Sequence, residues 1–303
     1  MKTITSTLLL ASCASCLANT FGVTGTEGYG TLDPQSIYHI TSNGNTTKVA
    51  NTANIVPNSL AFNPVTNVYY YGDHFGTDLY AYDVSSGSNV MVADLVNHGM
   101  PADYFLSGGA DFYNGTYYYS PERQELTMGP DTVPQQANDI YAVNFSADGM
   151  SILSHTKLDI TLPTGWSSIG DFGDIAIDTS TGILYGSSWA VNGTINDGAF
   201  FWSLNLSDPT QQIQVLGQTS LSNDNVYQVA YDAIEDAIFG NEWLTNEYLV
   251  INEADGTVVS STPIAGNFYD LASSALPDVK VPEPSSTLLL GLASLGFTLR
   301  RKR

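Results

Sequence analysis

An aromatic segment that ends in a turn recurs five times along the chain, and this repeat constrains the fold more than any other feature. Each copy starts with an apolar or aromatic pair, alternates with a period of two, and stops at Gly or Pro. Such a pattern predicts a β-strand followed by a hairpin turn. The copies are residues 37–44, 79–87, 140–149, 201–209 and 248–256.

A second strand-like unit precedes four of these copies and returns, truncated, near the end of the chain. Repeats of about 40–50 residues with four strands each are typical of β-propeller blades. We therefore expect an all-β fold, a five-bladed β-propeller, with small alanines on the crowded inner strands. The equivalent positions, 50, 65, 54 and 42 residues apart, are Ala61, Asp111, Ala176, Ala230 and Ala272.

The two ends of the repeat array are incomplete in complementary ways. The first aromatic strand lacks its preceding partner, and the last inner strand lacks its followers. Closing a ring would place residues 269–273 inside the blade begun by residues 29–50, and closure removes exposed sheet edges. A β-sandwich is the alternative, but it would not predict this split. In loose form the repeat resembles the LY-x-[IV]-D-x-x-TG units of YVTN- and WD40-like propellers, which implies the fold and no residue-level function.

The distribution of charge excludes one class of partner. Thirty acidic residues face only four basic ones between residues 19 and 284, namely Lys48, Arg123, Lys157 and Lys280. A surface of this kind repels phosphate backbones, so we expect no nucleic acid. Both cysteines, Cys13 and Cys16, fall in the first eighteen residues, which excludes thiol nucleophiles, disulfides and Cys-bound zinc from the body.

The first eighteen residues have the pattern of a secretory signal peptide. Lys2 is a short positive segment, residues 8–17 are mostly apolar, and Ala18 offers a small residue for cleavage. We expect export through the Sec pathway. The alternative is a lipoprotein cleavage box, Leu-Ala-Ser-Cys, that ends at Cys13.

The last residues form a three-part pattern. Pro282, Glu283 and Pro284 precede an apolar run at 287–299, and a basic cluster follows. The run would span roughly 20 Å as a helix, short of the ~30 Å hydrocarbon core of a bilayer. The basic cluster would hold its end in the cytoplasm as a stop-transfer anchor. It consists of Arg300, Arg301, Lys302 and Arg303.

This pattern resembles the PEP-CTERM sorting tail of Gram-negative bacteria, also catalogued as the C-terminal domain of some ice-binding proteins. The resemblance covers residues 281–303 and leaves 19–280 as the body. It implies recognition of Pro282, Glu283 and Pro284 by exosortase, a membrane-embedded transpeptidase-like enzyme that cuts near this motif. It also implies delivery to the cell surface or extracellular matrix, in company with exopolysaccharide. It implies nothing about the chemistry of the body.

One face of a propeller carries the loops between strands two and three and between blades. We expect these at 72–78, 120–138, 186–199 and 240–247, and at 51–58, 95–108, 161–173 and 217–227. Exposed aromatic rings beside Asp and Asn would suit a sugar, because a ring stacks on a pyranose while polar groups bind its hydroxyls. The alternative is that each Trp packs over its own loop, and Trp202 is expected in the core. The candidate ligand-binding residues are Asp73, His74, Trp166, Asp171, Trp189, Asp197 and Trp243.

Catalytic and metal patterns are weaker. Asp73, His74 and His98 would approach one another on the loop face, with Asp78 and Asp103 nearby, as a metal candidate. His39 and His155 fall within expected strands, and Glu122 with Glu125 is one carboxylate pair among many. Calcium is the cofactor most compatible with the acidic surface, at Asp148-Gly149, Asn196-Asp197 or Asp255-Gly256, although these are turn residues first.

These observations favour a secreted, noncatalytic protein that binds exopolysaccharide, with calcium as a bridging ion. The alternative is an enzyme, a polysaccharide lyase, glycosidase or lactonase, that uses the same face. No motif of a known catalytic class is present to decide for it.

Overall fold

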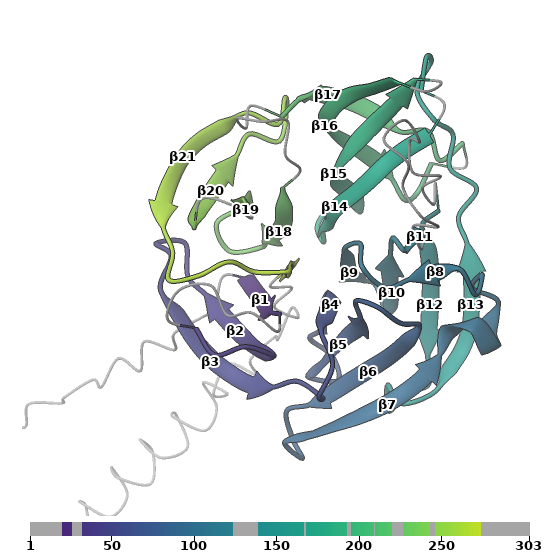
Figure 1. Ribbon diagram of the computed structural model, residues 1–303, viewed down its shortest axis with the longest axis vertical. Helices are drawn as coiled ribbons and strands as arrows, with labels where there is room; N and C mark the ends of the chain where they lie inside the picture. Colours follow the sequence, from purple (N-terminus) through teal and green to yellow (C-terminus); the bar gives the residue numbers. More distant parts are fainter. Residues whose placement is uncertain are drawn as a thin grey trace, which may run out of the picture.

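A computed structural model describes residues 20–25, 32–123, 139–166, 168–192, 195–208, 210–219, 227–242 and 246–273. Five four-stranded antiparallel sheets stand in a ring around a central axis, and each sheet has one edge strand next to the axis (Figure 1). The prediction of an all-β, five-bladed propeller is confirmed. Within the described ranges the one helical element is a short 3-10 helix, η1 (Leu95–His98).

The blades follow the chain around the ring. From the axis outward, the strands of blade 1 are β22 (Asp270–Ser273), β1 (Thr20–Thr24), β2 (Ser36–Ile40) and β3 (Thr46–Asn51). Those of blade 2 are β4 (Pro57–Asn63), β5 (Val68–Asp73), β6 (Asp78–Asp83) and β7 (Ser88–Asp94). Blade 3 is β9 (Ala110–Tyr113), β10 (Thr116–Tyr119), β12 (Tyr141–Phe145), β13 (Ile152–Lys157). Blade 4 is β14 (Ser168–Asp178), β15 (Ile183–Asn192), β16 (Ile195–Asn205) and β17 (Gln214–Gln218). Blade 5 is β18 (Gln228–Asp232), β19 (Ala237–Glu242), β20 (Glu247–Ile251) and β21 (Val258–Pro263). A two-stranded sheet joins β8 (Tyr104–Phe105) to β11 (Glu122–Arg123).

Blade 1 is built from both ends of the described chain. The C-terminal strand β22 pairs antiparallel with β1, and Thr20 lies opposite Ser273. Figure 1 shows the purple β1 beside the yellow-green end of the described chain. The predicted closure by residues 269–273 is thus confirmed. The blade begins earlier than expected, because the short segment Thr20–Thr24 supplies the partner strand that the repeat pattern did not reveal.

The hairpin of blade 4 corrects two expected loops. β15 continues to Asn192 and β16 begins at Ile195, so most of 186–199 is strand, and Trp189 pairs with Ala199. Similarly, β14 begins at Ser168, inside the expected loop 161–173. The expected strand ends followed from analogy with the shorter blades. In blade 4 the β-forming residues Trp, Val, Ile and Phe continue past those ends and extend the ladder.

The core consists of the rings and aliphatic side chains that fill the spaces between blades. Ala61, Ala176, Ala230 and Ala272 on the inner strands are fully buried, as predicted. Trp202 is also fully buried, and its indole N–H donates to Ser188 Oγ at 2.9 Å. Gly186 makes room for this ring, since a Cβ there would lie 2.2 Å from it.

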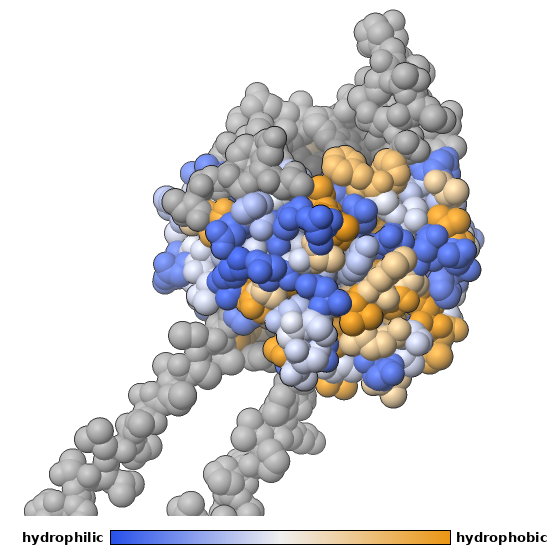
Figure 2. Space-filling view, turned by 60° about the horizontal axis from the view of Figure 1, so that its bottom comes forward, coloured by the Kyte–Doolittle hydropathy of each residue, from blue (hydrophilic) through white to orange (hydrophobic). Residues whose placement is uncertain are grey.

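The outer strands leave some apolar side chains in solvent. Figure 2 shows hydrophobic residues interspersed with hydrophilic ones on one side of the molecule. Such scattered residues are normal for a folded surface. Those on the outermost strands are Val90, Met91, Leu153, Val215 and Val259.

Removal of β22 tests the closure. We expect residues 19–269 to lose cooperative urea unfolding, followed by near-UV circular dichroism, because β1 and the neighbouring inner strands lose their central partner. Residues 19–276, which keep β22, serve as the control and should unfold like 19–280. A cooperative transition at an unchanged midpoint in 19–269 would contradict the role of β22.

Candidate functional site on the loop face

The innermost strands all begin at one face of the ring, which we call the loop face. In the described chain it carries residues 32–35, 52–56, 74–77, 95–109, 158–166 and 264–269. The opposite face carries the hairpin turns, including 41–45, 63–67, 146–149 and 252–257, and we call it the turn face. This division follows from the antiparallel order of strands in each blade.

Three buried carboxyl groups line the axis between the two faces. Asp174 on β14 accepts backbone N–H groups of Val229 at 2.9 Å and Leu271 at 3.1 Å. Asp270 on β22 accepts the N–H of Leu60 on β4. These bonds run from one inner strand to another, so the carboxyl groups tie four of the five blades together.

The third axial carboxyl group, Asp111 on β9, completes the ring of ties. It accepts the N–H of Ile177 on β14 at 2.6 Å and the hydroxyl of Ser273 on β22. Ser273 in turn accepts the N–H of Tyr231 on β18 at 2.9 Å. All three aspartates are at most 1% exposed, which makes them structural groups rather than groups that meet a ligand from solvent.

Burial in a site with little solvent favours the neutral form of each carboxyl group. Burial raises the pKa of Asp111 to about 7, against the opposing effect of its hydrogen-bond donors. Burial also raises the pKa values of Asp174 and Asp270 well above their usual range, and the two side chains are hydrogen-bonded to each other. Since two adjacent buried carboxylates repel, this pair retains a proton.

A chain of polar groups lies above the axis, at the start of β4. The Asn58 amide donates to His74 Nδ1 at 3.0 Å and to the Ser107 carbonyl at 3.0 Å. The Ser107 hydroxyl donates to Glu122 Oε2 at 2.5 Å. Segments of blades 2 and 3 are therefore held together at the mouth of the axis by side-chain hydrogen bonds.

An exposed aromatic ring stands beside this chain. Phe75 is 65% exposed and is the one largely exposed Phe, Tyr or Trp among the side chains that the structure describes. Its ring centroid lies 4.4 Å from that of His74, with the rings at 83°. The Asp73 carboxylate accepts the Phe75 N–H at 3.2 Å and so fixes the turn that presents the ring.

Acidic groups surround the same turn. Burial, followed by repulsion from Asp94 and Asp73, raises the pKa of Asp78. Asp94 accepts the Thr77 hydroxyl at 2.8 Å. The turn 74–77 therefore combines an apolar ring with oxygen acceptors on its two flanks. Asp73 and His74 were expected from the sequence, whereas Phe75 was missed, and its only signal is an apolar residue inside a loop bounded by Asp and Gly.

The other candidate residues that the structure describes lie outside this turn. Trp166 is half-buried and packs against the core of blades 3 and 4, with its ring 5.3 Å from that of Phe200. Asp171, Trp189 and Asp197 lie on β14, β15 and β16, in the extended hairpin of blade 4. Trp243 lies outside the described residues.

The histidines have packing partners. His155 donates from Nδ1 to the His98 carbonyl at 2.9 Å and bonds the Tyr119 hydroxyl at 2.8 Å. His39 bonds the Tyr69 hydroxyl at 3.0 Å. Within the described ranges, no three His, Asp or Glu side chains are grouped to hold a metal ion. Glu125, the expected partner of Glu122, lies outside those ranges.

Two of the three turn aspartates proposed for calcium use their oxygens locally. Asp148 accepts the Ser146 hydroxyl and the Met150 N–H, and Asp255 accepts the N–H and hydroxyl of Thr257. They act as turn residues, the first role expected of them.

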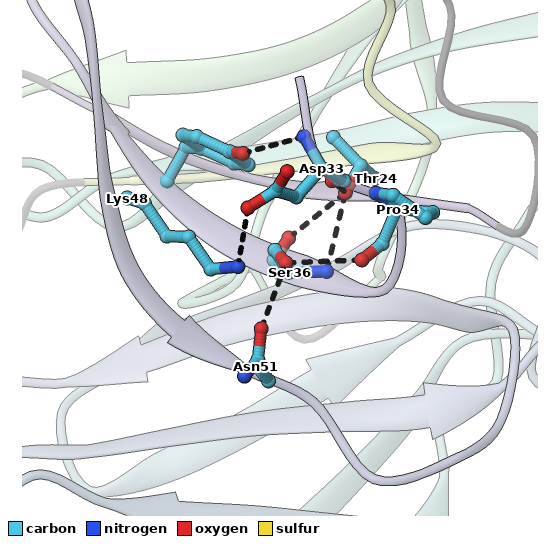
Figure 3. Close-up of polar contacts among 7 residues, drawn as sticks. Thr24, Asp33, Pro34, Ser36, Lys48 and Asn51 are labelled. Carbon is cyan, nitrogen blue, oxygen red and sulfur yellow. Dashed lines mark hydrogen bonds and ion pairs between the residues drawn. The ribbon is translucent and has the colours of Figure 1, made fainter.

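The two lysines whose side chains the structure describes are paired. Lys48 Nζ lies 2.7 Å from Asp33, in the loop between β1 and β2, and Lys157 lies 2.5 Å from Asp139. Figure 3 shows Lys48 and Asp33 next to Ser36 and Asn51, which join the same loop to β2 and β3. These ion pairs link segments at the loop face, and the net charge of the protein stays negative.

The C-terminal pattern has a direct match. Residues 280–303 match the family profile described as PEP-CTERM protein-sorting motif. This stretch is a PEP-CTERM sorting motif. The motif marks the chain as an exosortase-dependent secreted surface protein. It follows β22, and no helix in the described residues is long and apolar enough to cross a membrane.

Comparison with other proteins finds distant structural similarity. No curated protein matches the chain. A chain of a nidogen/laminin complex is 12% identical, with 85% of this chain and 98% of that chain covered and a TM-score of 0.46. A gluconolactonase from Xanthomonas campestris is 11% identical, with coverage of 77% and 70% and a TM-score of 0.46. Likenesses of this size carry no inference about ligand or activity.

The axial carboxyl groups predict a pH dependence of stability. Because the pKa of Asp111 is raised from about 3.9 in the unfolded chain, its contribution is full below pH 4 and is lost as pH rises through about 7. Between pH 5 and 8 we expect the free energy of unfolding of residues 19–280 to fall by roughly 2–3 kcal/mol more than that of Asp111→Asn. Urea unfolding at both pH values measures the difference.

The quantity to compare is the change in the free energy of unfolding with pH. The absolute free energy does not serve, because the amide of Asp111→Asn accepts hydrogen bonds at its oxygen alone and the variant is less stable at every pH. Asp148→Asn is the control, since hydrogen bonds lower the pKa of this exposed group and it titrates below the window. Parallel curves for Asp111→Asn and the unmodified protein would contradict the assignment.

Proposed function

We propose that this exosortase-sorted protein binds exopolysaccharide at its loop face and performs no catalysis there. The observation that carries the proposal is the turn 74–77, where Phe75 is 65% exposed beside His74 and Asp73. A flat ring can stack on the apolar face of a pyranose, and neighbouring carboxylate and amide groups can bind its hydroxyls. A sorted surface protein meets such polymers outside the cell.

Two further features support a rigid binding surface. Hydrogen bonds from Asn58 and Ser107 join the loops next to the turn, so the ring is presented by a pre-organised frame. Pre-organisation lowers the entropic cost of binding. On the sequence pattern alone, we also propose Asp171, Trp189, Asp197 and Trp243 as further contacts along a polymer chain.

The enzyme alternative has less support. Glycoside hydrolysis uses two carboxyl groups that flank the scissile bond. The axial aspartates are buried and bind backbone N–H groups, so they do not meet a polymer. Glu122 accepts a hydrogen bond from Ser107 and holds a loop in place. The described residues therefore favour binding over turnover.

Replacement of Phe75 tests the binding surface. We expect Phe75→Ala to weaken binding of residues 19–280 to the producer's exopolysaccharide about tenfold, a loss of ~1.4 kcal/mol, because the stacking ring is removed. Titration calorimetry gives the affinity. Val65→Ala is the matched control, since Val65 is 82% exposed on the turn face.

Light scattering of the polymer in the same samples separates the two functions. A rise in mass on adding protein supports binding, and a fall means depolymerisation and supports the enzyme. Equal affinities for Phe75→Ala, Val65→Ala and the unmodified protein would overturn the proposed surface.

Replacement of Glu283 tests processing of the tail. In the producing cell we expect the mature protein to lose the peptide that contains Arg300–Arg303, and Glu283→Ala to retain it, because the acidic centre of the motif is gone. Mass spectrometry of the C-terminal peptides measures this. Ser285→Ala is the control, and retention of the peptide in the unmodified protein would refute exosortase processing.

A further inference from the structure

The two segments that the sequence directs to a membrane leave the propeller at the same face. β22 runs from the loop face to the turn face, and its last residue, Ser273, precedes the sorting tail. β1 runs in the opposite direction, and its first residue, Thr20, pairs with Ser273. The expected signal peptide and the tail therefore both connect to the turn face.

The tail is attached near the centre of that face. β22 is the innermost strand of blade 1, and Ser273 is 1% exposed, with bonds to Asp111 on β9 and Tyr231 on β18. Bonds to two other blades place Ser273 close to the axis. Because the tail is attached near the axis of the ring, it does not favour tilting of the body toward any one blade.

The tether is short. Thirteen residues, 274–286, separate Ser273 from the apolar run at 287–299. At about 3.5 Å per residue they reach at most ~45 Å when fully extended. With the run in the membrane, the turn face is the part of the body closest to the lipid, and the loop face lies on the far side.

The charge of the turn face opposes tilting. The described hairpin turns contain no Lys, Arg or His, and the acids in these turns or at the strand end beside one of them come from four of the five blades. An anionic membrane surface repels such a ring of charge, and tilting would bring one side of it closer to the lipid. The acids that are exposed or half-buried are Asp83, Asp148, Asp208, Glu235, Asp236, Glu253 and Asp255.

We propose that the turn face is the membrane-facing side of the anchored protein and that the loop face, with Phe75, is presented outward. This inference concerns the protein before its tail is processed, and it rests on insertion of the apolar run 287–299 into the membrane, as expected from the sequence. In this orientation the acidic turns face an anionic lipid surface. Electrostatic repulsion keeps them from touching the lipid, while the tail keeps the body close to it.

The absence of cysteine after Cys16 allows a clean test. Single-cysteine variants of residues 19–303 carry a donor dye, and vesicles with about one quarter anionic lipid carry an acceptor on the headgroups. Ala147→Cys and Ala254→Cys report on the turn face, and Ala102→Cys is the matched exposed position on the loop face. We expect more energy transfer from the two turn-face positions than from Ala102→Cys.

The salt dependence separates the tether from the charge. The screening length falls from about 30 Å at 0.01 M salt to about 3 Å at 1 M, so the difference between the two faces should shrink as salt is added. Equal transfer from all three positions, or more from Ala102→Cys, overturns the orientation while anchoring stands. Failure of the chain to float with the vesicles refutes anchoring, and with it the orientation.

Discussion

The inward edge of the innermost strands is the constraint on which the rest of the structure depends. Each of these strands has a partner on its outer side only, so its inward N–H groups face the axis with no ladder to join. Asp111, Asp174 and Asp270 accept these groups from neighbouring blades. A carboxyl group that is neutral or shares a proton accepts these N–H groups at a lower desolvation cost than an ionised carboxylate. This explains why the axial carboxyl groups are both buried and hydrogen-bonded.

The same constraint joins the end of the chain to the middle of the fold. β22 supplies both Asp270 and Ser273, two of the groups that bridge the blades, and it is the last described strand of the propeller in chain order. The sorting motif begins only a few residues later, at residue 280. All strands of the ring therefore precede the sorting motif in the chain, and a cut within the tail leaves every blade intact.

The site was only partly predictable. Asp73 and His74 were found because they fall in the expected loop 72–78 of the loop face, and the structure sets them beside Phe75. Phe75 escaped notice because one apolar residue in a loop has no periodicity to mark it. Trp189 and Asp197 were assigned to a loop by analogy with shorter blades, yet strand pairing continues through both, since cross-strand partners rather than local spacing decide where a hairpin ends.

The sequence by itself determined the number of blades, the split first blade and the sorting tail, because these depend on periodicity and on the order of local patterns. Only the tertiary structure decided the axial network. The repeat places Asp111 on an inner strand, but nothing in the sequence marks Asp111, Asp174 and Asp270 as a group among the thirty acids, and they lie far apart in the chain. Ring closure brings them to one axis, removes water from them and raises their pKa values. Burial and proximity of this kind arise from packing, and no local pattern in the sequence encodes them.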